Sequence, residues 1–172
     1  MASDGSPPYA YCPVCGRSLE RPDREGGARC PSCERSWYRN SAPTVGCVIV
    51  RDGKALVTVR AFEPEKGKID LPGGFLAHGE TPFDGLRREL REELGIEVEA
   101  GVEDCVQMAT HRYGPAGDYN LSLGFQVRWV SGEPSPSDDV ADIRWVGLDE
   151  IDDLDFAWKH NRELVRKVLS DG

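Results

Sequence analysis

The sequence lacks an apolar run long enough to cross a bilayer, and it lacks the charged and then apolar N-terminal segment of a signal peptide. We therefore expect a soluble, cytoplasmic protein with no membrane partner. Positive charge is also scarce, because 21 Lys and Arg stand against 30 Asp and Glu, for a net charge of −9. This shortage disfavours nucleic acid as a partner, since that binding depends on Lys and Arg at phosphates. A nucleotide ligand stays open, because a bound metal ion can invert the local field.

The chain has 172 residues, of which 39% are hydrophobic and 30% charged. This length allows one medium domain, or one domain with a small module beside it, and either can bury a core. Residues 1–9 are small, polar and rich in proline, so we expect a disordered tail.

Four of the six cysteines form two C-x2-C pairs, namely Cys12, Cys15, Cys30 and Cys33. Two such pairs are a strong signal for a Zn²⁺ ion bound by four thiolates, and a site closed by four cysteines is structural rather than catalytic. The alternative is two disulfides, which the expected cytosolic setting disfavours. The sequence predicts a small zinc ribbon over residues 10–36.

A helix is predicted over residues 82–94, where local signals mark both ends. Thr81 is suited to the N-cap, Pro82 to the first helical position, and Gly95 to the stop. At about 100° per residue, the apolar side chains form one stripe and three glutamates form a neighbouring sector. The apolar set is Phe83, Leu86, Leu90 and Leu94, and the acidic set is Glu89, Glu92 and Glu93.

Three carboxylates side by side repel one another unless a cation joins them. Mg²⁺ and Mn²⁺ take oxygen ligands of this kind and share their shell with substrate phosphates. The alternative is a solvated helix face rich in Glu and Arg, which is common.

Sequence patterns typical of strands precede and follow this helix along the chain. An Asp-Gly turn at 52–53 between apolar runs predicts a hairpin of strands 45–51 and 54–60. Further strands are predicted over 96–107 and 119–129, and a closing amphipathic helix is predicted over 156–169. The mixture indicates an α/β fold.

The stretch from residue 74 to residue 96 resembles the signature of the Nudix hydrolases, G-x5-E-x7-R-E-U-x-E-E-x-G-U, where U is aliphatic. The matching residues are Gly74, Glu80, Arg88, Glu89, Leu90, Glu92, Glu93, Gly95 and Ile96. The resemblance implies an α/β/α Nudix sandwich with a mixed sheet over residues 37–172, preceded by the zinc ribbon. It also implies a metal-dependent pyrophosphohydrolase that cleaves a nucleoside diphosphate linked to another group, X.

The resemblance also implies roles for individual residues. Glu89, Glu92 and Glu93 hold Mg²⁺ or Mn²⁺, with the Gly74 carbonyl as a further ligand. Arg88 orients Glu89, and Glu80 supports the loop or helps with metal. The water is activated by metal, by one of the helix glutamates or by an acid outside the signature, which differs between members. The candidates for that outside acid are Glu133, Asp138 and Asp139. We expect Asp139, with an exposed loop aspartate as the equal alternative.

The substrate class follows only in part from the resemblance. A zinc ribbon ahead of a Nudix domain is similar to NADH pyrophosphatases, but residues 98–130 lack their S-Q-P-W-P-F-P-x-S motif. Members acting on ADP-ribose and FAD are also similar. The substrate is therefore expected to be ADP-ribose-like or a dinucleotide, and many members are homodimers. The alternative function is a non-catalytic nucleotide-sensing or protein-binding module on the same fold.

Four residues were considered for contact with a base or ribose. They flank a glycine-containing loop, and they could equally be solvated: His111, Arg112, Tyr113 and Tyr119.

Overall fold

The computed structural model describes residues 9–20, 24, 27–115 and 118–171. All of the predicted disordered tail except Tyr9 lies outside the described residues. The chain divides into two compact units after Asn40. Within the described residues, no helix has the length and apolar character that a membrane span requires.

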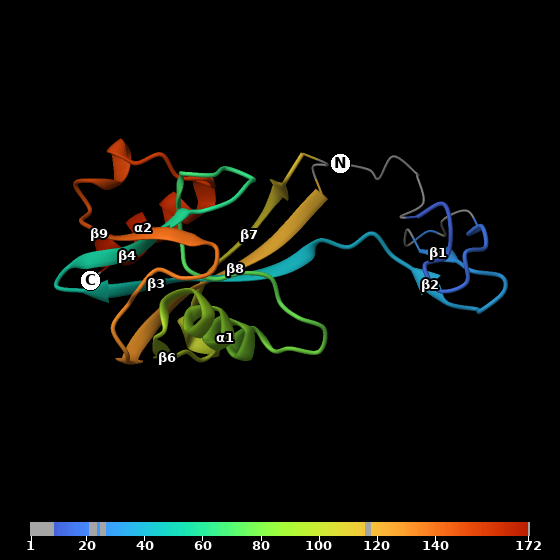
Figure 1. Cartoon of the computed structure of the whole chain (residues 1–172), viewed down its shortest axis with the longest axis horizontal. Helices are drawn as coiled ribbons and strands as arrows, with labels where there is room; N and C mark the ends of the chain where they lie inside the picture. The colour runs from blue at the N-terminus through green and yellow to red at the C-terminus, as the bar shows by residue number, and fades with distance from the viewer. Residues whose placement is uncertain (1–8, 21–23, 25–26, 116–117, 172) are drawn as a thin grey trace. The chain divides into compact units, whose positions relative to one another are not determined.

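The small unit contains a two-stranded antiparallel sheet, drawn in blue in Figure 1, of strands β1 (Ala28–Arg29) and β2 (Ser36–Trp37). The ring of Trp37 lies edge-on to that of Tyr9, with centroids 6.2 Å apart. Among the residues of this unit that the structure describes, Cys12, Ala28 and Cys30 are buried and apolar. So few buried side chains make a small core, and a unit of this size usually needs a metal or disulfides to fold.

The large unit is built on a mixed seven-stranded sheet with strand order β5-β4-β3-β8-β6, while β7 pairs with β8 and β9 pairs with β4. Of the strand pairs named here, β3 and β8 run parallel and the others run antiparallel. The strands are β3 (Ala42–Arg51), β4 (Lys54–Arg60), β5 (Ile69–Asp70), β6 (Glu97–Glu99), β7 (Cys105–Tyr113), β8 (Asp118–Ser131) and β9 (Val140–Val146). The helices are α1 (Pro82–Leu94) and α2 (Lys159–Asp171), with short 3-10 turns η1 (Val102–Asp104) and η2 (Ile151–Asp153).

Helices cover both faces of this sheet (Figure 1). Alternate side chains of β3 explain the two layers, because Cys47 and Ile49 face the core under α1 whereas Val48 faces the core under α2. Leu86, Leu90 and Leu94 bring α1 onto the first core. Leu164, Val165 and Val168 bring α2 onto the second. The predicted α/β/α sandwich with a mixed sheet is confirmed.

The predicted hairpin forms, but its two strands soon separate. β3 and β4 pair only at Val50–Arg51 with Lys54–Ala55. Beyond that point β3 pairs with β8, and β4 pairs with β9. The loop after β5 fills the opening, because the N–H groups of Val45 and Cys47 donate to the carbonyls of Gly74 and Pro72, at 2.9 and 3.0 Å. The separation therefore lets the loop that contains Gly73 and Gly74, called the glycine loop below, pack directly against β3.

Two predicted elements are wrong at their boundaries. The strand predicted over 96–107 is instead β6, the turn η1 and the start of β7. The closing helix begins at Lys159 rather than Phe156, because Phe156 forms a parallel bridge with Ile69 and the Ala157 N–H donates to the Ile69 carbonyl at 2.8 Å. Sheet contacts thus take the residues that the apolar pattern assigned to the helix.

Candidate functional site

Helix α1 carries the acidic residues, and its ends fix which way they point. The Thr81 hydroxyl accepts a hydrogen bond from the Asp84 N–H at 3.2 Å, and Gly95 ends the helix in a left-handed conformation with φ of 69°. With the leucines buried, Glu93 lies at the edge of the core, where it is 4% exposed. Glu92 lies farther out, with a side chain that is 51% exposed.

Arg88 joins three of the acidic side chains. Its Nη1 donates to Glu89 at 2.8 Å and to Glu92 at 3.1 Å. Its Nε and Nη2 donate to the two oxygens of Glu80 at 2.9 and 3.0 Å, and Nη2 also donates to the Phe75 carbonyl. The guanidinium therefore ties the helix to the preceding loop, and its charge offsets that of neighbouring carboxylates.

Glu80 lies on the loop side of this network. Besides Arg88, it accepts a hydrogen bond from the Ala77 N–H at 2.8 Å. Its hydrogen bonds, first to the Arg88 side chain and then to this N–H, lower the pKa of Glu80 to about 2. The contacts formed by Glu80 are thus those of a residue that supports the loop.

Glu93 faces the glycine loop and a second acid. The Gly73 N–H donates to its Oε2 at 2.8 Å, and Asp139 lies close enough for its charge to act on the Glu93 carboxyl group. Burial raises the pKa of Glu93 well above its ordinary value, and the charges of Asp139 and Glu89 raise it further, against the Gly73 hydrogen bond. Burial likewise raises the pKa of Glu89, despite its hydrogen bond with Arg88. The cluster thus holds more negative charge than Arg88 offsets.

The two glycines before the helix differ in what a side chain would meet there. A Cβ on Gly74 would lie 2.5 Å from Oε1 of Glu89, and a Cβ on Gly73 would lie 2.2 Å from the Val45 carbonyl oxygen. Gly73 also has φ of 136°. The Gly74 carbonyl, expected as a metal ligand, accepts the hydrogen bond from Val45. Close packing against the backbone of β3 is thus sufficient reason for Gly73, whereas a side chain at position 74 would displace the Glu89 carboxylate.

Of the three acids considered as the base, the structure brings Asp139 to the cluster. The turn at 138–139 is held beside α1, because the Ser137 N–H donates to the Glu93 carbonyl at 2.8 Å. The Asp139 carbonyl also accepts from the Ala61 N–H at 2.8 Å. Asp138 and Asp139 are both exposed, but Asp139 belongs to the wall of the cleft described below, whereas Glu133 is 3.9 Å from Arg51 with a side chain that is 87% exposed.

A cleft of about 90 Å³ opens beside the acidic cluster, and Gly73, Gly74 and Asp139 belong to its wall. The rest of the wall includes residues that sequence reasoning missed: Arg60, Asp70, Phe75, Asn120, Trp158, His160 and Asn161. These residues come from distant parts of the chain. The polar residues 159–161 at the start of α2 were the one local signal, and the amphipathic pattern hid it.

Half of the residues considered for base contact line this cleft. His111 and Tyr113 do so, but Arg112 lies between them on β7 and so points to the other face of the sheet. There its Nε donates to the Tyr119 hydroxyl at 3.4 Å, and its guanidinium lies 5.5 Å from that ring. Arg112 and Tyr119 therefore contact each other rather than the cleft.

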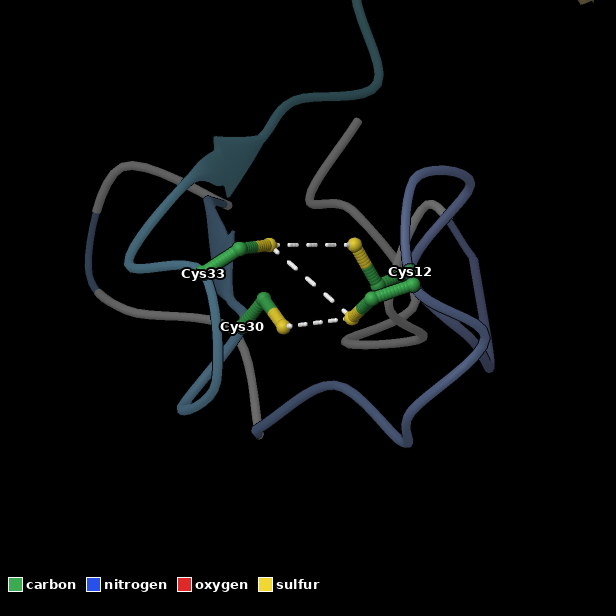
Figure 2. A group of neighbouring side chains, drawn as sticks. Cys12, Cys30 and Cys33 are labelled. Carbon is green, nitrogen blue, oxygen red and sulfur yellow. Dashed lines mark hydrogen bonds between the residues drawn. The ribbon is translucent and has the colours of Figure 1, made fainter.

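The small unit gathers the four paired cysteines, all as free thiols, so the disulfide alternative is not formed (Figure 2). Sγ of Cys12 and Sγ of Cys33 are 3.5 Å apart, and Sγ of Cys15 lies 3.5 Å from Cys30 and 3.9 Å from Cys33. Four sulfurs around a tetrahedral Zn²⁺ ion, each about 2.3 Å from it, are spaced about 3.8 Å apart. The cluster therefore fits zinc.

Among the described residues, these cysteines are the one group of His, Cys, Asp or Glu whose ligand atoms all lie within 4.8 Å of one another. The carboxylates of α1 are less closely gathered, since Arg88 draws Glu89 and Glu92 to itself. Their chemistry still suits a hard divalent cation, because carboxylate oxygens are the ligands that Mg²⁺ and Mn²⁺ prefer.

Residues 40–168 match the family model described as the NUDIX domain. One relative is the NAD-capped RNA hydrolase NudC of Pseudomonas aeruginosa, which is 30% identical over 161 residues, or 93% of this chain and 55% of that protein. The chain thus spans about half the length of the curated relatives it matches.

Solved structures show the same fold. A NUDIX hydrolase from Nitrosomonas europaea matches with a TM-score of 0.73 and 24% identity, over 95% of this chain and 92% of that one. The MutT NUDIX hydrolase from Burkholderia pseudomallei matches with a TM-score of 0.64 and 27% identity, over 75% of this chain and 98% of that one.

Proposed function

The chain belongs to the NUDIX domain family, and on that premise we propose that it hydrolyses the pyrophosphate bond of a nucleoside diphosphate linked to another group. The observation that carries this proposal is the convergence of Asp139 with Glu89 and Glu93 of α1 at the mouth of a cleft. Excess negative charge beside an opening of this kind suits a site that holds a divalent cation and a phosphate chain.

The cation is assigned to Glu89, Glu92 and Glu93, with the Gly74 carbonyl as the further candidate. Bound Mg²⁺ or Mn²⁺ would neutralise charge on the phosphate oxygens and lower the pKa of a water molecule. Zn²⁺ is assigned to the cysteine cluster, where four thiolates leave no open position for chemistry.

The protein's own residues have separate tasks in this proposal. The Gly73 N–H holds the Glu93 carboxylate in one orientation, and Arg88 does the same for Glu89. Asp139 comes from the turn opposite α1, so it can accept the proton of a water that attacks phosphorus. In this division, fixed ligands position the charge and a separate acid takes the proton, which are two of the tasks in the hydrolysis of a pyrophosphate.

The substrate is proposed to be ADP-ribose-like or a dinucleotide such as FAD or NADH. The P. aeruginosa relative is named an NAD-capped RNA hydrolase, which favours a substrate with two nucleotide halves over a nucleoside triphosphate. The cleft of about 90 Å³ is far smaller than the roughly 300–1,000 Å³ of pockets that enclose a drug-sized ligand. It therefore has room for one ring of such a substrate, with the remainder lying outside.

The test is release of mononucleotide from ADP-ribose, NADH, FAD, NAD-capped RNA and a nucleoside triphosphate panel, each with Mg²⁺ or Mn²⁺. It is run beside Glu93→Gln and, as a matched control, Glu97→Gln, whose carboxylate contacts Arg91 on the surface. Metal-dependent turnover lost only in Glu93→Gln would support the enzyme and rank its substrates. Folded, zinc-loaded protein that cleaves none of them would favour the alternative, a nucleotide-sensing or protein-binding module.

A further inference from the structure

Aromatic rings from four segments meet in the cleft beside the acidic cluster. On β7, the rings of His111 and Tyr113 have centroids 5.0 and 5.5 Å from that of Trp158, which precedes α2. The imidazole of His160, from the first turn of α2, lies 4.4 Å from that of His111 and is tilted by 32°. Phe75, from the glycine loop, lies edge-on to Tyr113 at 5.3 Å. Flat apolar walls of this kind suit a planar ligand.

Each of the two histidines places in this apolar wall a ring nitrogen that forms no hydrogen bond with the described residues. Nδ1 of His111 and Nε2 of His160 are buried and have no hydrogen-bond partner in the part of the chain that the structure describes. His160 is 9% exposed. Buried polar atoms are nearly always paired, so an orphaned pair beside an opening indicates a missing ligand.

The charge state of the pair limits what that ligand can be. Burial lowers the pKa of both imidazoles, with the neighbouring His111 adding to the effect on His160. Each neutral imidazole offers one donor and one acceptor, so the pair suits a group that carries both. A phosphate group is anionic and offers only hydrogen-bond acceptors. Two neutral imidazoles give it no positive charge, so phosphate suits this pair less well.

The nearest carboxylate is already paired. Asp70 accepts from Arg60 Nη1 at 2.7 Å, from the Leu71 N–H at 2.9 Å and from Asn161 Nδ2 at 2.6 Å. The Arg60 guanidinium also lies 5.8 Å from the Trp158 ring. A cationic ring on Trp158 would thus meet a guanidinium already in place, while Asp70 is paired and Asp139 of the same wall is assigned to the acidic cluster, so the contacts at Trp158 disfavour such a ring.

We propose that this cleft, whose wall includes His111, Trp158 and His160, recognises an uncharged nitrogen heterocycle such as adenine. The ring stacks on Trp158 and Tyr113, and its ring nitrogens and exocyclic amino group form hydrogen bonds with the two imidazoles. The inference rests on the proposed function for its biological role, since it names the half of the substrate that is selected, but the binding itself requires no hydrolysis.

Mononucleotides test the inference without turnover. AMP, cationic nicotinamide mononucleotide and ribose 5-phosphate are titrated by calorimetry into the full, zinc-loaded chain with Mg²⁺. Stacking and hydrogen bonding of one base predict that AMP binds at least about tenfold more tightly than ringless ribose 5-phosphate. Nicotinamide mononucleotide, with its charged ring, should bind no more tightly than ribose 5-phosphate.

Two variants locate the ring. His160→Phe keeps a flat ring but removes both nitrogens, and Trp158→Leu removes the stacking surface. Each variant should lose the tenfold tighter binding of AMP. Its affinity for ribose 5-phosphate should be unchanged. His78→Phe, at the exposed third histidine of the chain, is the matched control and should retain the advantage. In the unmutated protein, AMP should also shift the imidazole NMR resonances of His111 and His160, which requires no variant to fold.

Three outcomes would overturn the inference: equal affinity for AMP and ribose 5-phosphate, tighter binding of the cationic ring, or an AMP advantage that survives both cleft variants. Its failure is separable from that of the proposed function. AMP selectivity that persists in Glu93→Gln, together with no turnover in any preparation, would support the ring site and reject the hydrolase.

Discussion

The backbone N–H of Gly73 donates a 2.8 Å hydrogen bond to Oε2 of Glu93, a residue one helix away along the chain. This bond sets the orientation of a carboxylate that is 4% exposed and whose pKa is raised first by burial. A proton or a metal ion can each neutralise a buried acid held in this way, so the two compete for the Glu93 carboxylate.

Replacing the Glu93 carboxylate by an amide should separate catalysis from folding. Glu93→Gln retains an oxygen that accepts from Gly73 but loses the charge that a cation requires. We expect kcat to fall by at least about 100-fold, while the free energy of unfolding changes by less than about 1 kcal/mol. Steady-state kinetics and urea denaturation measure the two quantities. Unchanged kcat would exclude Glu93 as a metal ligand.

Arg88 should matter both to stability and to activity. Arg88→Met leaves Glu80, Glu89 and Glu92 without their shared partner, and we expect a loss of about 1–3 kcal/mol in the free energy of unfolding and of about 10- to 100-fold in kcat/KM. Arg88→Lys should also lose activity, because an ammonium cannot span the same oxygens.

The neighbouring Arg87 provides the control for Arg88. Its guanidinium contacts Asp84 at 3.5 Å on the surface, so Arg87→Met should stay within about 0.5 kcal/mol of the unmutated protein. Equal effects of the two substitutions would show that general helix charge, rather than the Arg88 network, is responsible.

Local signals were sufficient to predict α1. Thr81, Pro82 and Gly95 set both of its ends, and the observed helix covers residues 82–94 as predicted. The glutamates followed from the helical period and the signature. Short-range rules succeed here because capping and periodicity are determined within a few residues of the helix itself.

The cleft could not be predicted in the same way. His111 of β7 and His160 at the start of α2 are 49 residues apart in the sequence, and their rings meet only through the tertiary packing of α2 on the sheet. Trp158 falls inside the helix predicted over residues 156–169, but it lies just before the observed start of α2. Likewise, the choice of Asp139 over Glu133 depends on how the turn at 138–139 is held against α1, which is a tertiary contact.

The small unit should depend on zinc. We expect one zinc per chain by elemental analysis, and its removal by a chelator should unfold residues 10–36, because structural zinc contributes about 10–16 kcal/mol in small metal-bound units. Cys12→Ser should lose the zinc, whereas Cys105→Ser, at a half-buried cysteine outside the cluster, should keep it. Backbone NMR of the unit follows its folding. Zinc retained in Cys12→Ser, or lost in Cys105→Ser, would reject the four-cysteine assignment.

The pH dependence of stability should report on His160. Burial lowers the pKa of His160 from 6.5 to about 4, with His111 lowering it further and Glu163 opposing. Between these two values the unfolded chain binds a proton that the folded chain does not. The free energy of unfolding therefore falls as pH decreases from 6.5 to 4, by at most about 3 kcal/mol from this residue, and the contribution is constant at higher pH.

Comparison with His160→Phe isolates this contribution, because the other titrating groups of the chain, including His111 with its neighbour Asp70, are present in both proteins. Urea denaturation at intervals from pH 4.5 to 7.5 should give a shallower decrease of stability in the variant below pH 6.5, and the two slopes should agree above it. Parallel curves through the whole range would mean that His160 takes up its proton equally well in the folded and unfolded chains. That result would remove the reason for treating the imidazole pair as neutral, and with it the preference for an uncharged ring.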